Sequence, residues 1–192
     1  AKWGNITAAT AHEAMGRRGA VHSAIKPIGA GMRVVGPAVT CVCAPGDNLS
    51  LHVAMRVAQP GDVLVCDAGG YTEQGLFGDV MATSAQVKGI AGLVVHGGVR
   101  DVATIRKMEF PVFSSSICMR GTVKETLGPV NGPIVLGGIR VNPGDLVIAD
   151  DDGVCIVPLE EIDAVYENAL ILEEKEEGFR ANFTPTVTTW EL

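Results

Sequence analysis

One stretch of the chain, residues 75–101, decides the fold, and it reads Gly75-Leu-Phe-Gly-Asp79-Val-Met-Ala-Thr-Ser-Ala-Gln-Val-Lys-Gly89-Ile-Ala-Gly-Leu-Val-Val-His-Gly-Gly-Val-Arg100-Asp101. A loop over residues 75–79 leads into a segment of helical character, residues 80–87, which Lys-Gly closes. The apolar run 91–95 that follows is typical of a buried strand, as is the run 63–67 before the loop. The stretch therefore predicts a strand-helix-strand unit within an α/β fold.

The charged residues of this stretch stand at its loops, in the spacing Asp79-x20-Arg100-Asp101. In such units ligands gather where the carboxyl ends of strands meet the amino ends of helices, because free backbone N–H groups and loop side chains point into one crevice. The N–H groups of Val80 and Met81 are the first unsatisfied donors of the predicted helix and can hold a carboxylate. The spacing therefore predicts a binding site for a small anion beside a metal ion.

Each of these residues also has a purely structural interpretation. Asp79 and Asp101 could cap the helices that follow them, and Arg100 could be an ordinary surface cation. In the functional interpretation, the planar fork of Arg100 suits a carboxylate or an enolate oxygen, and Asp101 supplies one oxygen to a hard divalent ion. Gly78 lets the backbone come close to a ligand.

Composition and charge exclude several classes of protein. The chain has 192 residues, of which 47% are hydrophobic and 19% charged, which is typical of one globular domain. The net charge is −7 and the 15 Lys and Arg residues are scattered, so we expect no nucleic-acid partner. No segment has the roughly 18 to 20 apolar residues of a membrane helix, and the first residues lack a signal-peptide core. We expect a cytoplasmic protein without a membrane partner.

Other clusters of reactive residues have simpler interpretations. The five cysteines lie mostly in apolar, strand-like runs without a CxxC pair, so we interpret them as reduced core residues (Cys41, Cys43, Cys66, Cys118 and Cys155). The four histidines form no HxH or HExxH pattern, although His52 and His96 are placed to line a pocket. We interpret Asp150-Asp151-Asp152-Gly153 as a solvated turn between two strands.

The remaining elements complete a single domain. We expect helices within residues 5–15, 49–58, 104–109 and 159–179, and strands within 32–44, 63–67, 91–95, 111–114 and 146–149. Thr7 or Thr10 can cap the first helix. Pro-Gly-Asp before an apolar strand occurs at 60–62 and again at 143–145, which reflects either two similar halves or turn chemistry alone. We place the domain at residues 1–180 and a C-terminal tail at 181–192.

Several motifs together resemble a known family. They are His12-Glu-Ala-x-Gly-Arg17, Pro45-Gly-Asp-Asn48, Gly78-Asp79-x20-Arg100-Asp101, Gly121-Thr-Val-Lys-Glu-Thr-Leu-Gly128 and Val141-Asn-Pro-Gly-Asp-x3-Ala-Asp-Asp-Asp-Gly-Val154. Over residues 5–180 the chain resembles the 4-hydroxy-4-methyl-2-oxoglutarate / 4-carboxy-4-hydroxy-2-oxoadipate aldolases, which belong with the regulator of ribonuclease activity A.

This resemblance implies a fold and an activity. The fold is a layered α-β-β-α sandwich of a single domain, and the assembly is a homotrimer or homohexamer. The activity is that of a class II pyruvate aldolase, a lyase that needs a divalent metal cation (Mg²⁺ or Mn²⁺) and cleaves 4-hydroxy-2-oxo diacids to pyruvate and a second oxo acid. Such enzymes also act as oxaloacetate decarboxylases.

The resemblance also implies residue roles. Asp101 would be the direct metal ligand, Asp79 would act through a metal-bound water, and Arg100 would bind the carbonyl or enolate oxygen of pyruvate. The backbone from Gly78 to Met81, which includes Val80, would take the carboxylate. A glutamate from the C-terminal helix of a neighbouring subunit would help activate water, and Glu176 falls at that position within the acidic run 173–177. Lys124 and Arg17 are cations that could meet the distal carboxylate of the substrate.

Two other functions are considered beside the aldolase. The chain could be a non-catalytic regulatory binding protein of the ribonuclease-regulator type, but retention of Asp79, Arg100 and Asp101 together favours an enzyme. A methyltransferase of quinone synthesis is disfavoured because no glycine-rich cofactor loop follows the first strand.

Overall fold

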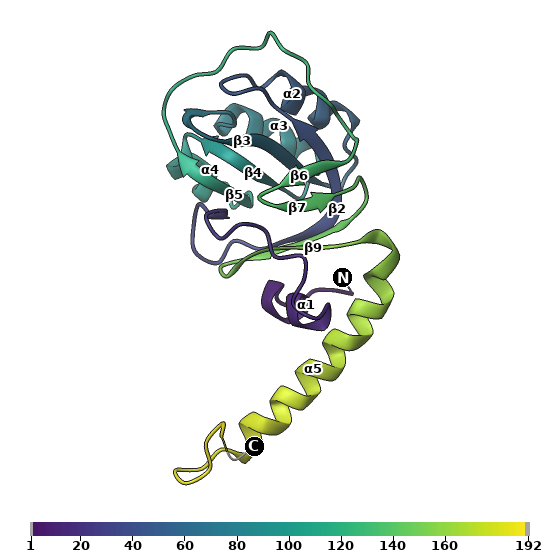
Figure 1. Ribbon diagram of the computed structural model, residues 1–192. Helices are drawn as coiled ribbons and strands as arrows, with labels where there is room; N and C mark the ends of the chain where they lie inside the picture. The colour runs from purple at the N-terminus through teal and green to yellow at the C-terminus, as the bar shows by residue number, and fades with distance from the viewer. Residues whose placement is uncertain (1, 191–192) are drawn as a thin grey trace.

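A computed structural model describes residues 2–190 of the chain, and Figure 1 shows its mixed α/β arrangement. The strands are β1 (Lys26–Pro27), β2 (Val34–Val42), β3 (Val63–Gly75), β4 (Gly92–Val99), β5 (Val112–Ile117), β6 (Ile134–Leu136), β7 (Ile139–Val141), β8 (Leu146–Asp150) and β9 (Gly153–Val157). The helices are α1 (Ala8–Ala14), α2 (Leu49–Val57), α3 (Asp79–Lys88), α4 (Val102–Lys107) and α5 (Ile162–Asn182), the last preceded by a 3₁₀ turn, Leu159–Glu161.

A seven-stranded sheet in the order β1-β5-β4-β3-β2-β8-β9 forms the centre, and β6 and β7 form a separate two-stranded ribbon. The four middle strands, β5, β4, β3 and β2, run parallel because helices connect them, whereas β8 and β9 add antiparallel strands beyond β2. The carboxyl ends of the parallel strands therefore share one edge of the sheet.

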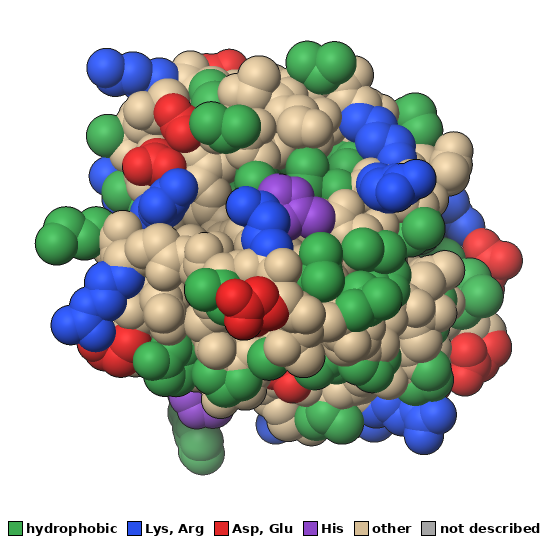
Figure 2. Space-filling model, turned by 90° about the horizontal axis from the view of Figure 1, so that it is seen from above, with side chains coloured by type: hydrophobic (Ala, Val, Ile, Leu, Met, Phe, Trp, Pro, Cys, Tyr) green, Lys and Arg blue, Asp and Glu red, His purple; other side chains and the backbone are tan. Residues whose placement is uncertain are grey.

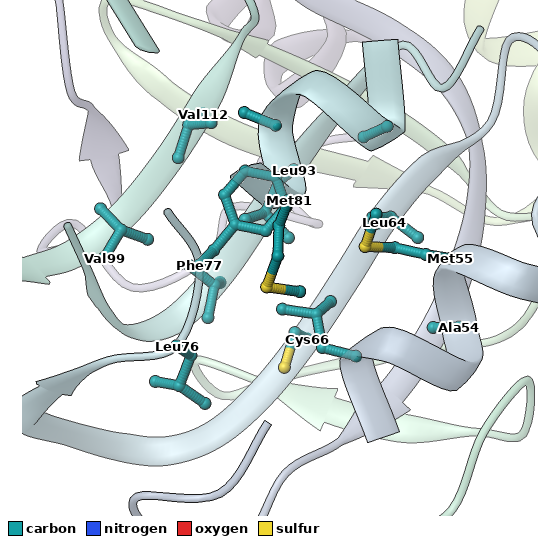
Figure 3. Close-up of a cluster of buried hydrophobic side chains, with 14 of the residues drawn as sticks. Ala54, Met55, Leu64, Cys66, Leu76, Phe77, Met81, Leu93, Val99 and Val112 are labelled. Carbon is teal, nitrogen blue, oxygen red and sulfur yellow. The ribbon is translucent and has the colours of Figure 1, made fainter. Parts of the chain in front are cut away.

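Three buried cores separate four layers. Helices α2, α3 and α4 cover one face of the parallel strands (Figure 1), and their core includes Leu64 and Leu93, with Met55, Phe77 and Met81 close by (Figure 3). The alternate residues of the same strands, such as Val65, face a second core shared with β6 to β9, because successive side chains of a strand point to opposite faces. Helices α1 and α5 pack on the outer side of β8 and β9 around a third core. This order of layers confirms the predicted α-β-β-α sandwich.

Element boundaries differ from the sequence predictions mainly in the sheet. β3 runs to Gly75, although we expected the strand to end at residue 67 and a loop to begin at 75. Its second half is polar and rich in glycine, and it stays in the sheet because Tyr71 and Gly75 pair with Gly97 and Gly98 of β4 across irregularities in the register. The pattern of hydrophobic residues in this part of the sequence does not predict the pairing with β4.

Several smaller predictions are confirmed. Thr7 caps α1 by accepting a hydrogen bond from the Thr10 N–H at 3.0 Å. The acidic turn joins β8 to β9, and its residues Asp151 and Asp152 are exposed as predicted. Asp150 departs from the prediction of a solvated turn, because its carboxylate is largely shielded and accepts a hydrogen bond from the Ala8 N–H at 2.7 Å. The five cysteines are free thiols, and all but Cys118 are buried.

Helix α5 extends away from the rest of the molecule (Figure 1). Only Val165 and Ala169 of its residues are buried among those described, while Leu170 and Ile171 are exposed. The helix passes residue 180, where we placed the end of the domain, and the last two residues of the predicted tail, 191 and 192, lie outside the described residues. None of the described helices is long and apolar enough to cross a membrane.

Candidate active site

The ends of β3 and β4 bring the motif residues together. Gly75, the last residue of β3, pairs with Gly98 near the end of β4. Beyond the sheet, the Arg100 N–H donates a hydrogen bond to the Phe77 carbonyl at 2.9 Å. Both segments leave the sheet at the same edge, so Asp79 at the start of α3 meets the residues that follow β4. The loop after β3 and the loop after β4 therefore converge, as we predicted from the sequence.

Asp101 is held in an unusual backbone conformation. Its φ of 56° lies in the left-handed region, which costs free energy for a residue with a side chain and often marks a functional site. It occupies the N-cap position of α4, but its carboxylate makes no capping hydrogen bond. Instead, Oδ2 lies 3.3 Å from the Asp79 N–H nitrogen and 3.5 Å from Nε of Arg100. Asp101 is therefore the N-cap residue by position, as the structural interpretation allowed, but its side chain does not cap α4 and faces the loop of Asp79 instead.

The amino end of α3 is formed by Gly78 and Asp79. The N-cap residue is Gly78, so the alternative interpretation of Asp79 as the cap is wrong. Asp79 is the first helical residue, and its Oδ1 accepts a hydrogen bond from the Val80 N–H at 2.8 Å. The Met81 N–H belongs to the same first turn, whose donors have no acceptor within the helix. A Cβ at Gly78 would collide with Oδ2 of Asp101, so only glycine leaves this space open.

A cavity of about 310 Å³ opens over these groups. Figure 2 shows a face of the molecule on which a histidine lies in a hollow beside a Lys or Arg side chain. The predicted ligands and binding residues that line the cavity are Gly78, Asp79, Val80, Met81, Arg100, Asp101 and Lys124. His52 also lines the cavity, as do residues that we did not assign to the site from sequence, among them Asn48, Gly121 and Thr122.

Asn48 and His52 each bring to the cavity a buried polar atom that has no partner among the described residues. The Asn48 side chain donates a hydrogen bond to the Leu76 carbonyl at 2.8 Å, which fixes the amide against the end of β3. Its Oδ1 and Nε2 of His52 are buried and lack a hydrogen-bond partner within the described chain. Buried polar atoms are nearly always paired, so these two atoms are suited to bind a polar ligand or water. Burial, and next the charge of Lys124, lower the pKa of His52, which favours the neutral imidazole.

Asp47 ties the loop that carries Lys124 to the start of α2. Its carboxylate is buried and accepts hydrogen bonds from the N–H groups of Leu49, at 2.9 Å, and of Glu125 and Thr126, at 2.8 and 2.7 Å. Burial alone would raise the pKa of Asp47, but these backbone N–H groups together lower it below its usual value. The loop therefore depends on a buried anion for its position over the cavity.

Two predicted residues lie away from the cavity. Glu176 is on the exposed part of α5, where its carboxylate pairs with Arg180 at 2.7 Å. Arg17 follows α1 and pairs with Glu13 at 3.1 Å, so it is not one of the cations of this cavity. The prediction for Glu176 concerned a neighbouring subunit and stays a prediction.

The carboxylate oxygens in the cavity are suitable ligands for a hard divalent cation. The contacts of the Asp101 carboxylate given above use Oδ2, and Oδ1 makes no hydrogen bond among residues 2–190. The two contacts are also long, so little free energy is lost when the carboxylate turns to a cation. Asp79 adds a second carboxylate at the same edge, and a pair of carboxylates is a common way to hold Mg²⁺.

The chain is similar to known proteins whose descriptions give them different functions. Residues 8–156 match the family model described as RraA-like: Aldolase/RraA. A protein of Halalkalibacterium halodurans named "Putative 4-hydroxy-4-methyl-2-oxoglutarate aldolase" is 40% identical over 147 residues, which cover 77% of this chain and 70% of that protein.

Two solved structures have the same fold. RraAS2 of Streptomyces coelicolor, described as an unusual member of the RNase ES inhibitor RraA protein family, aligns with a TM-score of 0.83 and 30% identity, covering 95% of this chain and 96% of that one. A structure from Geobacillus kaustophilus described as S-adenosylmethionine: 2-dimethylmenaquinone methyltransferase aligns with a TM-score of 0.66 and 34% identity, covering 70% and 83% of the two chains. Because these descriptions differ, the fold alone does not decide the function and the site has to.

Proposed function

The chain belongs to the RraA-like family, Aldolase/RraA, and on that premise we propose that it is a divalent-metal-dependent aldolase that releases pyruvate from 4-hydroxy-2-oxo diacids and decarboxylates oxaloacetate. One observation carries the proposal. A cation, two carboxylates and the amino end of a helix line a single cavity, and one carboxylate oxygen of Asp101 makes no hydrogen bond among the described residues. A protein that only binds another macromolecule does not need that combination.

The cavity offers separate groups for each part of a 2-oxo acid. The first-turn N–H groups of α3, next to Gly78, suit the carboxylate on C1, since the positive end of the helix dipole lies there. The substrate carboxylate would replace the carboxylates of Asp79 and Asp101, which accept the N–H groups of Val80 and Asp79 in this structure. Arg100 suits the oxygen on C2. Lys124 lines the same cavity and provides a second cation for the distal carboxylate, which is why we favour diacids.

The reaction follows from these positions. A water molecule held by the Asp79 carboxylate accepts the proton of the C4 hydroxyl, the C3–C4 bond breaks, and its electron pair moves to the C2 oxygen as an enolate. The Arg100 guanidinium stabilises that negative charge. The same water returns a proton to C3, which gives pyruvate and a second oxo acid. In oxaloacetate the C3–C4 bond breaks with loss of CO₂ and leads to the same enolate.

A divalent cation fits beside Asp101, with Asp79 next to it. When bound, it would supply positive charge close to the C2 oxygen and so act as a Lewis acid. Mg²⁺ and Mn²⁺ suit a site made of carboxylate oxygens and water better than softer ions do.

The proposed assembly is a trimer or hexamer in which Glu176 of one copy reaches the cavity of the next. The shape of the chain supports this, because α5 extends from the body and exposes Leu170 and Ile171 (Figure 1). Within its own chain Glu176 has only Arg180 as a charged partner among the described residues.

A second function, inhibition of a ribonuclease, is suggested by the descriptions of relatives, such as that of the protein from Streptomyces coelicolor, and by no feature of the cavity. One assay distinguishes between the aldolase function and the inhibitor function. Purified protein with Mg²⁺ or Mn²⁺ is given oxaloacetate and a series of 4-hydroxy-2-oxo acids, and pyruvate is measured with lactate dehydrogenase. If no substrate releases pyruvate with any divalent metal, the binding function moves ahead.

The site itself is tested with a matched pair of carboxamide variants. Asp101→Asn should abolish metal-dependent turnover, because an amide is a much weaker ligand for a hard cation. Asp163→Asn, at an exposed carboxylate on α5, should leave turnover unchanged. Turnover that survives both EDTA and Asp101→Asn would contradict the assignment.

A further inference from the structure

Three of the five cysteines meet in the core below α2. Cys41 lies on β2 and pairs in register with Cys66 of β3, and Cys43 follows two residues after Cys41. Residues two apart on an extended chain share a face, and registered partners on neighbouring strands also share one. All three side chains therefore point to the same side of the sheet, into the core under the helices.

The thiols are close together and shielded from water. Sγ of Cys66 lies 3.5 Å from Sγ of Cys43, and the three sulfur atoms all lie within 4.8 Å of one another. The exposed fractions of Cys41, Cys43 and Cys66 are 0%, 3% and 0%. Figure 3 shows Cys66 in the same core as the thioether side chains of Met55 and Met81. An ion bound symmetrically by three sulfurs at about 2.3 Å needs sulfur atoms about 4.0 Å apart, so small shifts of the side chains are enough.

The contacts within the cluster involve only sulfur. Sγ of Cys66 donates a hydrogen bond to Sγ of Cys43, and all three cysteines belong to the apolar core under the helices. Thiolates rather than thiols bind metal ions, so an ion that enters the cluster would displace the thiol protons of its ligands.

We propose that Cys41, Cys43 and Cys66 bind one Cu⁺ ion, in a site separate from the proposed active site. Sulfur ligands select soft ions, and three of them in an apolar core suit Cu⁺, which needs no water ligand. Zn²⁺ fits less well, because structural zinc sites have four ligands and no fourth His, Cys, Asp or Glu joins the three cysteines among the described residues.

Cysteines elsewhere in the chain provide matched controls. Cys155 is as buried as the three but lies in another core, and Cys118 is partly exposed. The Cys43→Ala and Cys66→Ala variants each remove one proposed ligand, whereas Cys155→Ala and Cys118→Ala remove none.

The experiment offers reduced full-length protein Cu⁺ as its bathocuproine disulfonate complex under anaerobic conditions and follows the loss of the chelator's colour. The wild type and both control variants should each take up one Cu⁺ per chain, and the affinity should fall at least 100-fold in Cys43→Ala and Cys66→Ala. X-ray absorption of the loaded wild type should give only sulfur neighbours.

A second measurement does not depend on the variants folding. Binding to the folded state alone stabilises it, so the Tm of the wild type should rise with the first equivalent of Cu⁺ and not with later ones. The proposal is overturned if the wild type takes no Cu⁺ from the chelator, if uptake is lost in Cys118→Ala instead, or if nitrogen or oxygen neighbours surround the metal. Failure of the aldolase assay would not affect any of these outcomes.

Discussion

Replacement of Asp47 by asparagine should loosen the loop of Lys124 while the rest of the fold stays intact. Oδ1 of Asp47 accepts the Leu49 N–H at the start of α2, and Oδ2 accepts the N–H groups of Glu125 and Thr126. Asparagine has one acceptor oxygen. If that oxygen stays at the helix, the amide NH₂ faces the two N–H groups of the loop, and both of those hydrogen bonds are lost.

The magnitude follows from the hydrogen bonds that the variant loses. A hydrogen bond to a charged group contributes about 1.5–3 kcal/mol, and the two loop N–H groups can turn to water, so we take the lower end for each. The expected loss in the free energy of unfolding is about 2–4 kcal/mol, within the 5–15 kcal/mol of a typical domain. Alanine would also remove the bond to α2 and risks unfolding.

Asp145→Asn is a matched control for this change. Asp145 is as buried as Asp47 and accepts the N–H groups of Asn142 and Leu159, at 2.7 and 3.0 Å, but it is not among the residues that line the cavity. Both variants should lose stability to a similar extent in urea unfolding. Only Asp47→Asn should speed hydrogen exchange at the amides of Glu125 and Thr126, by about tenfold or more for each 1.4 kcal/mol of lost protection. Unchanged exchange at these two amides would refute the reasoning, whatever the effect on stability.

Three further changes test the walls of the cavity. Gly78→Ala should reduce metal-dependent turnover about tenfold or more, because the new Cβ displaces the Asp101 carboxylate. Its effect on the free energy of unfolding should be small, since the displaced atom is the end of a side chain. The control Gly132→Ala, at a position with open space around it, should have no effect on turnover. Because the pKa of His52 is lowered in the folded state, the folded state binds fewer protons than the unfolded state once the pH falls below 6.5. The free energy of unfolding should therefore decrease as the pH falls below that value. His52→Gln should reduce this dependence on pH, as measured by urea unfolding at a series of pH values. Lys124→Met should raise the KM for a 4-hydroxy-2-oxo diacid about tenfold and leave that for a monoacid analogue unchanged; an equal rise for both would place Lys124 elsewhere in the mechanism.

The part of the site that could be predicted from sequence follows from one geometric rule. Parallel strands joined by a helix end at the same edge, so Asp79 after β3 and Arg100 after β4 had to meet. The rule gives positions but not conformations. The left-handed backbone of Asp101 and the position of Gly78 as the N-cap of α3 depend on contacts between the two loops. Local capping preferences pointed to Asp79 rather than Gly78 for α3.

For the part of the cavity formed by Asn48 and Lys124, the local sequence gave almost no indication that these residues would meet. Asn48 and Lys124 are 76 positions apart in the sequence, and a long segment without regular periodicity carries Lys124. Only tertiary hydrogen bonds, such as the Asn48 N–H to the Val123 carbonyl at 3.1 Å, bring them together. The cysteine cluster is similar, because Cys41 and Cys43 suggest a shared strand face while Cys66 joins them only through the register of β2 and β3.

The repeated Pro-Gly-Asp motif illustrates how far local chemistry reaches. It occurs three times, and in each copy the aspartate N–H donates to the carbonyl three residues earlier while the glycine has a positive φ: 76° at Gly46, 92° at Gly61 and 87° at Gly144. Proline followed by glycine with positive φ is the signature of a type II turn, so turn chemistry accounts for the repeat without two similar halves. The Asp62 carboxylate, which is only partly buried, accepts the Gln59 N–H from within its own turn, whereas that of Asp47 also accepts N–H groups of a distant loop. The same three residues therefore become part of a site only where the fold places a loop with free N–H groups against them.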